Sequence, residues 1–324
     1  MLYPLRFQPV FRQYIWGGRR LGEVLNKPIG DGDDFAESWE VVDHGEDQSV
    51  VAHGPLAGKT LHEVAAEHAQ ELFGQHAPQK QFPLLFKLLD CNRNLSVQVH
   101  PNDEQGARLD PPDLGKTEAW VILDARPGSQ VYAGLKSGID AATLKRETDA
   151  GRVEHCLHSF QPAAGDCIFI PAGTVHALGE GLLVAEIQQA SDTTFRLFDW
   201  NRVGADGQSR PLHVNQSLAV IDYERGPVSP QATDVVRTTD SAKTERLVEC
   251  DKFVLERTTF SGPITIGGDD RFHIVCLLSG EVAVANDPSG EALSKGQTVL
   301  LPATSKPTLT PSAGEAVLLD AYLP

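Results

Sequence analysis

The sequence is poor in cysteine and has no long apolar segment, and both features bear on where the protein works. Its five cysteines (Cys91, Cys156, Cys167, Cys250 and Cys276) form neither a CxxC pair nor a disulfide framework, so we interpret them as reduced thiols. No run of eighteen apolar residues occurs, which argues against a membrane span. The N-terminus also lacks the basic-then-apolar pattern of a signal peptide. We therefore expect a cytoplasmic protein.

Basic residues are scarce as well. The 28 lysines and arginines are outnumbered by 44 aspartates and glutamates, which gives a formal net charge of −16. Such a surface repels nucleic-acid phosphates, so we expect no nucleic-acid partner. A small phosphorylated substrate stays compatible with this charge, because a few local cations decide its binding.

What the chain does contain is typical of a soluble, turn-rich β protein. Apolar residues make up 41% of the sequence and charged residues 22%, as in globular proteins. The 29 glycines and 21 prolines favour short strands joined by turns. A chain of 324 residues exceeds one typical core, so we expect one large or two moderate domains.

The segment from Leu95 to Pro101 alternates strictly between apolar and polar residues, which predicts a β-strand. Ser96, Gln98 and His100 would share one face of this strand. Gln98 and His100 lie two residues apart, close enough to hold one ion or one ligand. A half-buried strand with a polar outer face is the simpler alternative, and the choice depends on partners for His100 elsewhere in the chain.

Two helices are predicted in this mainly β sequence. Thr60 and Glu63 form a capping box ahead of apolar residues at helical spacing, which predicts a helix over about 61–73. A second helix is expected over about 140–150, with Asp140 as its N-cap.

Partners for His100 are found in the segment 165–176, GDCIFIPAGTVH. Here a turn, a buried strand and a Pro-x-Gly corner would aim the imidazole of His176 inward. This spacing of glycine, proline, glycine and histidine resembles the second motif of the cupin β-barrels. The first motif of that family presents a His-x-His pair and then a glutamate on an adjacent strand. Its counterparts in this sequence are Gln98-x-His100 and Glu118.

The resemblance implies one metal site made of Gln98, His100, Glu118 and His176. Two imidazoles, a carboxylate and an amide oxygen suit a borderline divalent ion such as zinc, with a position left open for water or substrate. The set contains no thiol, so it is not a structural zinc knot. We expect one Zn²⁺ per chain.

Longer stretches narrow the resemblance to the type I mannose-6-phosphate isomerase family, in its short bacterial branch. The match covers most of residues 1–225. In the longer branch of the family an Asn-His-Lys-Pro-Glu segment stands where this chain has LGKTE at 114–118, which keeps the lysine and the glutamate. The matching stretches are FPLLFKLLD (82–90), LSVQVHP (95–101), GKTE (115–118), PAGTVHA (171–177) and EIQQASDTTFRLFDW (186–200).

The resemblance implies an enzyme of carbohydrate metabolism that interconverts mannose 6-phosphate and fructose 6-phosphate through an enediol. It assigns Arg196 to the active site, where the guanidinium would hold the phosphate or stabilise enediolate charge. Lys116 would share a strand face with Glu118, where it would move protons or bind phosphate. Lys87, within an apolar run, is a further candidate for phosphate. The expected partner is therefore a small phosphorylated sugar, and the oligomeric state stays open.

The implied fold is mainly β, with two cupin-type (jelly-roll) β-barrels and a small number of helices in or beside the first. Residues 1–235 would form the metal-binding catalytic domain and 246–324 a C-terminal domain without a metal site. The composition of 226–244, rich in Pro, Thr, Asp and Ser, predicts a linker. The C-terminal unit repeats only the first part of the 165–176 spacing, and we interpret its single histidine, His273, as structural.

Two other functions fit parts of the pattern. Two histidines and one carboxylate on a β-barrel also describe iron-dependent oxygenases, although Gln98, Lys116 and Arg196 weigh against that alternative. A non-catalytic sugar-phosphate-binding cupin is the second alternative.

Overall fold

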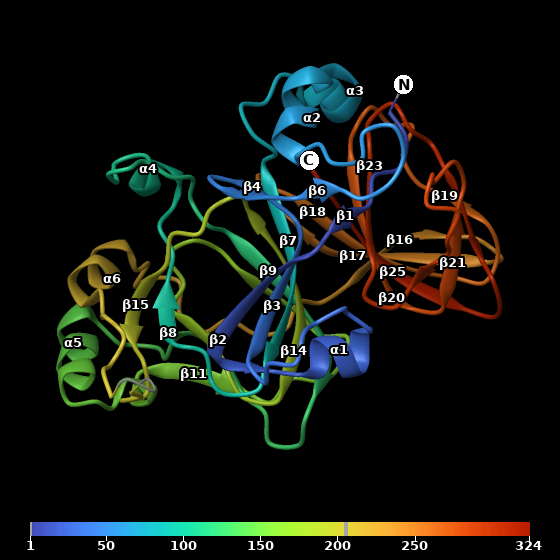
Figure 1. The fold of residues 1–324 in the computed structure, drawn as a ribbon. Helices are drawn as coiled ribbons and strands as arrows, with labels where there is room; N and C mark the ends of the chain where they lie inside the picture. The colour runs from blue at the N-terminus through green and yellow to red at the C-terminus, as the bar shows by residue number, and fades with distance from the viewer. Residues whose placement is uncertain (1, 204–206) are drawn as a thin grey trace.

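The computed structural model describes residues 2–203 and 207–324, and antiparallel β-strands dominate it (Figure 1). A six-stranded sheet in the order β12-β9-β14-β7-β3-β2 faces a five-stranded sheet in the order β11-β10-β13-β8-β15, and we call this pair the first sandwich. The strands of the six-stranded sheet are β12 (Cys167–Ile170), β9 (Glu118–Ala125), β14 (Leu182–Gln189), β7 (Leu84–Cys91), β3 (Phe35–Val41) and β2 (Val10–Gly18). Those of the five-stranded sheet are β11 (Leu157–Phe160), β10 (Val131–Leu135), β13 (His176–Leu178), β8 (Val97–Val99) and β15 (Phe195–Phe198).

A second pair of sheets, the second sandwich, follows in the C-terminal part of the chain. Its six-stranded sheet has the order β16-β17-β18-β25-β20-β23 and its four-stranded sheet the order β19-β24-β21-β22. The six strands are β16 (Asp234–Thr238), β17 (Ala242–Glu249), β18 (Val254–Phe260), β25 (Ala316–Tyr322), β20 (His273–Ser279) and β23 (Thr298–Leu301). The four strands are β19 (Ile264–Thr265), β24 (Thr308–Pro311), β21 (Glu281–Val284) and β22 (Leu293–Ser294).

Short helices and two small strand pairs complete the fold. The pairs are β1 (Phe7–Gln8) with β6 (Val50–Val51) and β4 (Asp43–His44) with β5 (Asp47–Gln48). The helices are α1 (Arg20–Leu25), α2 (Leu61–Glu67), α3 (Ala69–Phe73), α4 (Asp103–Gly106), α5 (Ala141–Asp149) and α6 (Val214–Val220), with 3₁₀ turns at Gly74–His76 and Val153–His155. The predicted mainly β class with few helices is thus confirmed. No helix among the described residues is both long and apolar enough to cross a membrane.

Both predicted helices are present, but the first is shorter than expected. The capping box of Thr60 and Glu63 starts α2, and Asp140 caps α5. The prediction of one helix up to residue 73 is wrong, because the chain leaves the helical conformation at His68 and restarts as α3. The break turns α3 so that the ring of Phe73 lies 5.9 Å from that of Phe82 in the core.

The linker predicted over 226–244 is wrong in its second half. Strand β16 and the start of β17 fall in this segment and pair with each other as the outer strands of the second sandwich. The C-terminal sheet therefore begins before residue 246. The composition is misleading here because β16 is an edge strand, exposed along its whole length, so that its polar residues face solvent.

The two sandwiches share one apolar core, which explains why β7 has no visible alternation. Phe86 and Leu88 on one face of β7 belong to this shared core, whereas Leu89 faces the interior of the first sandwich. Both faces are therefore buried, as a continuous apolar run predicts. On the far side of the shared core the ring of Phe272, from the second sandwich, lies 4.6 Å from that of Phe82.

Close backbone contacts hold the second sandwich against the N-terminal segment and the end of α3. Leu5, in the N-terminal segment, exchanges two backbone hydrogen bonds of 2.8 and 2.9 Å with Leu300 of β23. Gly74 follows α3 with φ +54°, and a Cβ there would lie 2.3 Å from the carbonyl oxygen of Asp270. Only glycine allows the helix to end against this loop without displacing it. Figure 1 shows α2 and α3 beside the C-terminal strands, drawn in orange and red, with α5 and α6 on the opposite side of the molecule.

Candidate active site

Strand register in the six-stranded sheet places a row of charged side chains inside the first sandwich. Glu186 of β14 lies directly opposite Lys87 of β7 on one side and Trp120 of β9 on the other. Glu118 is two residues before Trp120, so it shares the same face of the sheet. Directly opposed residues of neighbouring strands point to one face, so the three charged side chains converge although they come from distant parts of the sequence.

The five-stranded sheet contributes a second row that faces the first. His176 of β13 pairs with Gln98 of β8, and Gln98 pairs in turn with Arg196 of β15. Both rows line a cavity of about 280 Å³. This volume lies near the lower end of the range for small-molecule sites, about 300–1,000 Å³.

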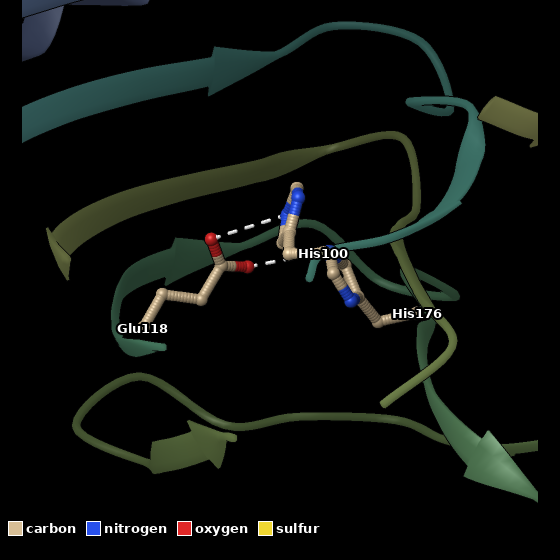
Figure 2. A group of neighbouring side chains, drawn as sticks. All are labelled: His100, Glu118 and His176. Atoms are coloured by element: carbon tan, nitrogen blue, oxygen red, sulfur yellow. Dashed lines mark ion pairs between the residues drawn. The ribbon is translucent and has the colours of Figure 1, made fainter. Parts of the chain in front are cut away.

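His100, Glu118 and His176 form a compact buried group at one end of this cavity (Figure 2). Their candidate ligand atoms all lie within 4.8 Å of one another, and each side chain is about 1% exposed. The Nε2 atom of His100 is 3.5 Å from one carboxylate oxygen of Glu118, and that of His176 is 3.2 Å from the other. Donor atoms bound to one zinc at about 2.0–2.2 Å lie about 3–3.5 Å apart, so these separations fit a shared ion.

The hydrogen bonds of both imidazoles favour metal binding. His100 Nδ1 lies 2.9 Å from the carbonyl oxygen of Thr193, and His176 Nδ1 lies 2.9 Å from that of Thr174. A carbonyl can only accept, so each Nδ1 donates and each Nε2 keeps a lone pair directed at Glu118. Burial lowers the pKa of His176 to about 4, and burial together with Lys116 lowers the pKa of His100 well below its usual value. Both rings are therefore neutral at pH 7, the state in which histidine binds a metal.

Gln98 lies at the edge of this group, with its Nε2 atom 3.3 Å from His176 Nε2. Its amide oxygen accepts a hydrogen bond of 3.3 Å from the hydroxyl of Ser96. A half-turn about the terminal bond would direct the oxygen towards the histidines while the amide nitrogen donated to Ser96. The residues present thus fit a divalent ion with two nitrogen and two oxygen ligands.

Lys116 lies next to the three-residue group and is almost fully buried. Its Nζ atom is 2.5 Å from Glu118 and 3.1 Å from His100 Nε2. It is also 3.7 Å from Glu186, so its ammonium connects the His–Glu–His group with the charged row of the sheet.

Lys87 and Glu186 form a buried ion pair of 3.2 Å on the floor of the cavity, and Glu37 lies 3.4 Å from the same ammonium. Burial opposes the charge on Lys87, but the two carboxylates outweigh it and raise the pKa of Lys87. Burial likewise opposes ionisation of Glu186, but Lys87 and Lys116 outweigh it and lower the pKa of Glu186. Both groups are charged at pH 7. For Glu118, burial and the neighbouring Glu186 raise the pKa, and a bound cation would counteract this.

Two arginines, Arg196 and Arg210, also line the cavity. Arg196 donates from Nη1 to the carbonyl oxygen of Pro211 at 2.9 Å, and its buried Nε has no hydrogen-bond partner among the described residues. Arg210 is held by two hydrogen bonds of 2.8 and 2.6 Å to the carboxylate of Asp199. Among the described residues no ion pair joins Arg196 to its acidic neighbours in sequence, Asp192 and Asp199, and Asp199 pairs with Arg202 and Arg210.

The loop after β14 supports the site from outside. Asp113 accepts hydrogen bonds from the hydroxyls of Ser191 (2.8 Å) and Thr193 (2.6 Å) and from the backbone NH of Leu114 (2.8 Å). Because the carbonyl of Thr193 orients His100, Asp113 acts on that imidazole through one intervening residue.

The structure brings the residues selected from the sequence into one region. Six of them line the cavity: Gln98, Glu118, His176, Lys116, Lys87 and Arg196. The seventh, His100, contacts Lys116 through its Nε2 atom at 3.1 Å. No sequence pattern predicted a role for Glu37, Glu186 or Arg210. Glu186 carried a usable signal, because a glutamate inside a fully buried strand requires a partner. Arg210 lies in a polar loop and carried none.

Comparisons with known proteins agree with this geometry. A profile for the type I phosphomannose isomerase catalytic domain matches residues 4–125. The mannose-6-phosphate isomerase ManA of Bacillus subtilis is 36% identical over 312 residues, which cover 92% of this chain and 93% of that protein. The mannose-6-phosphate isomerase of Streptococcus mutans is 34% identical over 306 residues, 94% of each chain. The crystal structure of mannose 6-phosphate isomerase from Bacillus subtilis matches with a TM-score of 0.90 at 29% identity and covers 99% of both chains.

Fold and site together define a β-rich, cupin-like protein with a compact His–Glu–His group at the end of a charged internal cavity. Sequence similarity over nearly the whole chain then identifies the family. The chain belongs to the type I phosphomannose isomerase family.

Proposed function

We propose that the protein is an aldose–ketose isomerase that interconverts mannose 6-phosphate and fructose 6-phosphate. The observation that carries this proposal is the convergence of four carboxylates, two lysines, two arginines and the neutral imidazole of His176 on one cavity, with His100 beside them, in a chain whose relatives of similar length are isomerases of this sugar phosphate. The alternative functions, an oxygenase and a non-catalytic binding protein, are not favoured by any of these relatives.

We propose that His100, Glu118 and His176 hold one Zn²⁺, with Gln98 as a weaker fourth ligand. When bound there, the ion would polarise the oxygens at C1 and C2 of the open-chain sugar. The neutral Nε2 atoms and the carboxylate of Glu118 fit this role, and the absence of thiols favours a site with an open position over a closed structural one.

The isomerisation moves one proton from C2 to C1 and a second proton between the oxygens O2 and O1. Glu186 is ionised and Lys116 lies 3.7 Å from it, so the pair offers one group that accepts a proton and one that donates it. Lys87 keeps Glu186 ionised and closes the floor of the cavity.

Arg196 is the proposed partner for the developing enediolate or for the phosphate. Its Nε is free of any protein acceptor within the described part of the chain, so it keeps a donor for substrate. Arg210, on the same wall, is pre-oriented by Asp199 and supplies a second cation for a dianionic phosphate. We assign these roles to the first sandwich, as expected for residues 1–235, and no part of this reaction to residues 246–324.

A coupled assay tests the proposal. Purified protein with its metal content measured is given mannose 6-phosphate, and fructose 6-phosphate is detected through a linked dehydrogenase. Glucose 6-phosphate serves as the matched control substrate. Formation of fructose 6-phosphate that stops on chelation and returns with Zn²⁺ is the expected result. Binding without turnover would instead favour a non-catalytic protein, and consumption of oxygen would favour the oxygenase.

A further inference from the structure

The second sandwich contains a polar cavity of its own, of about 330 Å³, which no part of the proposed reaction uses. Its walls come from the inner face of the six-stranded sheet and from the loop after β19. His273, Asp320 and Glu256 stand on three neighbouring strands at this end of the sandwich, where the apolar interior gives way to charged groups.

Register shows that this cavity occupies the place of the catalytic cavity. The spacing from Gly165 to Pro171 recurs from Gly296 to Pro302, so Ile170 of β12 corresponds to Leu301 of β23. Ile170 lies opposite Glu118 in β9, and Leu301 lies opposite His273 in β20. His273 therefore takes the position that Glu118 holds in the first sandwich.

The correspondence extends to the two neighbouring strands. Glu186 lies opposite the residue two after Glu118, and Asp320 lies opposite the residue two after His273. Lys87 pairs with Glu186 in the first sandwich, and Glu256 pairs with Asp320 in the second. All three charged positions of the catalytic row thus carry ionisable residues in the second sandwich, with different chemistry at each.

The charges in this second cavity are balanced. His273 lies between two carboxylates, with Nδ1 3.0 Å from Asp320 and Nε2 3.1 Å from Asp269. Burial opposes the charge on His273, but the two aspartates outweigh it and raise its pKa to about 10, so the ring is cationic at pH 7. Arg246 makes two hydrogen bonds of 2.9 and 2.6 Å to Glu256. With Arg237 at the rim, three cations face three carboxylates.

This arrangement disfavours ionic ligands. An anion would meet three carboxylates, and two of the three cations, His273 and Arg246, are already paired with them. A divalent cation would need carboxylates that converge, whereas Asp269 and Asp320 bind opposite edges of one protonated ring. The only cluster of three potential metal-ligating residues within 2–203 and 207–324 is the one at His100.

We propose that this cavity binds a neutral polyhydroxylated molecule of about monosaccharide size. Sugar hydroxyls both donate and accept, so they match alternating carboxylates and guanidinium groups. The volume is close to that of the catalytic cavity, about 280 Å³. His273, interpreted from the sequence as structural, becomes a residue of a binding site. The proposal does not depend on the isomerase activity.

The experiment uses the full-length, metal-loaded protein and ligand-observed NMR followed by calorimetric titration. The probes are the methyl α-glycosides of mannose, glucose and galactose, and myo-inositol, none of which has a carbonyl or a phosphate to engage the isomerase reaction. Inorganic phosphate and Mn²⁺ are titrated separately. Asp269→Asn and Arg237→Ala change exposed groups at the rim, so they are expected to keep the fold, whereas Asp320→Asn changes the buried floor. Asp240→Asn, on an exposed turn, is the matched control for Asp269→Asn, and Glu186→Gln controls for binding in the catalytic cavity.

At least one neutral probe is expected to bind, with a dissociation constant in the range of about 1–10 mM. Loss of one hydrogen bond to a charged group would weaken binding about tenfold in Asp269→Asn or Arg237→Ala. Asp240→Asn and Glu186→Gln should bind the probe normally, and both rim variants should keep full isomerase activity. No binding of any probe, binding unaffected by the rim variants, loss of binding in Glu186→Gln, or selective binding of phosphate or Mn²⁺ would each overturn the proposal.

Discussion

Asp113 is expected to control metal affinity although it touches none of the proposed ligands. Its carboxylate holds the hydroxyls of Ser191 and Thr193, and the carbonyl of Thr193 orients His100. Hydrogen bonds to a charged acceptor are worth about 1.5–3 kcal/mol each. The side chain of Asp113 is 16% exposed, so we take the lower value for each of the two hydroxyl bonds. Asp113→Ala should then destabilise the loop by about 3 kcal/mol.

The effect on the metal follows from the freedom that His100 gains. Loss of the partner that orients a metal-binding histidine weakens metal affinity about 10–100-fold. We expect Asp113→Ala to fall in that range in a competition titration with a fluorescent chelator. Asp113→Asn keeps one carbonyl oxygen for both hydroxyls, so it should lie between Asp113→Ala and the parent protein.

The acid dependence of stability gives a second readout of the same contacts. Burial opposes ionisation of Asp113, but the bonds from His44 and the two hydroxyls outweigh it and lower its pKa. A carboxyl group whose pKa is lower in the folded state stabilises the fold above its unfolded pKa of about 3.9, and this contribution is lost as pH falls further. Asp113 also raises the pKa of His44, which adds stability that is lost as pH rises above about 6.5. The difference in unfolding free energy between parent and Asp113→Ala should therefore be largest near about pH 5 to 6, shrink below about pH 4 and decrease again as His44 loses its proton.

The matched control is Asp124→Asn. It removes a carboxylate that pairs with Arg20, remote from the metal group. A folded Asp113→Ala protein that binds Zn²⁺ as tightly as the parent would refute the reasoning, because the Thr193 carbonyl would then hold His100 without help.

Three further outcomes test the remaining assignments. His176→Ala should lose metal and activity together, whereas Gln98→Ala should lose less of both, and full metal occupancy in His176→Ala by elemental analysis would exclude the proposed ligand set. Arg196→Ala should lower kcat about 10²–10³-fold with metal content intact, as expected when a charge-stabilising donor is lost, and near-normal turnover would remove Arg196 from the mechanism. Truncation before Asp234 removes every strand of the second sandwich and uncovers the Phe82 side of the shared core. The truncated chain should therefore be insoluble in sedimentation or less stable in thermal unfolding. Stability equal to that of the full chain would contradict this.

The ligand group at His100 could be predicted because its signals are local. The alternation around Gln98 and His100 and the Pro-x-Gly corner before His176 each orient a side chain within a few residues, and the family resemblance joins them. The capping boxes of α2 and the N-cap of α5 are local in the same sense. A local pattern of this kind can be recognised in the sequence without knowing which other segments it contacts.

The remaining parts of the site depend on contacts that no local pattern contains. Glu37, Lys87 and Glu186 meet only because β3, β7 and β14 are neighbours in the sheet, and they come from segments 50 and 99 residues apart. The separate helix α3 after His68 packs Phe73 against Phe82 in the core, and strand β16 pairs with β17. The capping box and apolar spacing predicted one helix for the first segment, and composition predicted a linker for the second, because neither the core nor the partner strand is visible in the segment itself.

Comparison of the two sandwiches also shows why the loss of a sequence motif is weak evidence for the loss of a binding site. The decay of the Pro-x-Gly-x-x-His corner after Pro302 removes the histidine that would complete a metal group, and the sequence therefore predicts a C-terminal domain without a metal site and a structural His273. The sheet register, however, keeps three neighbouring inward-facing positions at the open end of the interior, which the motif does not describe.

Apolar residues at these three positions would extend the core and stabilise it by about 25 cal/mol per Å² of buried apolar surface. Buried charges there cost free energy unless each is paired, and a pure packing unit has no use for that cost. The pairing of His273 with two aspartates and of Arg246 with Glu256 offsets that cost, so this end of the second sandwich stays polar where apolar residues would have extended the core.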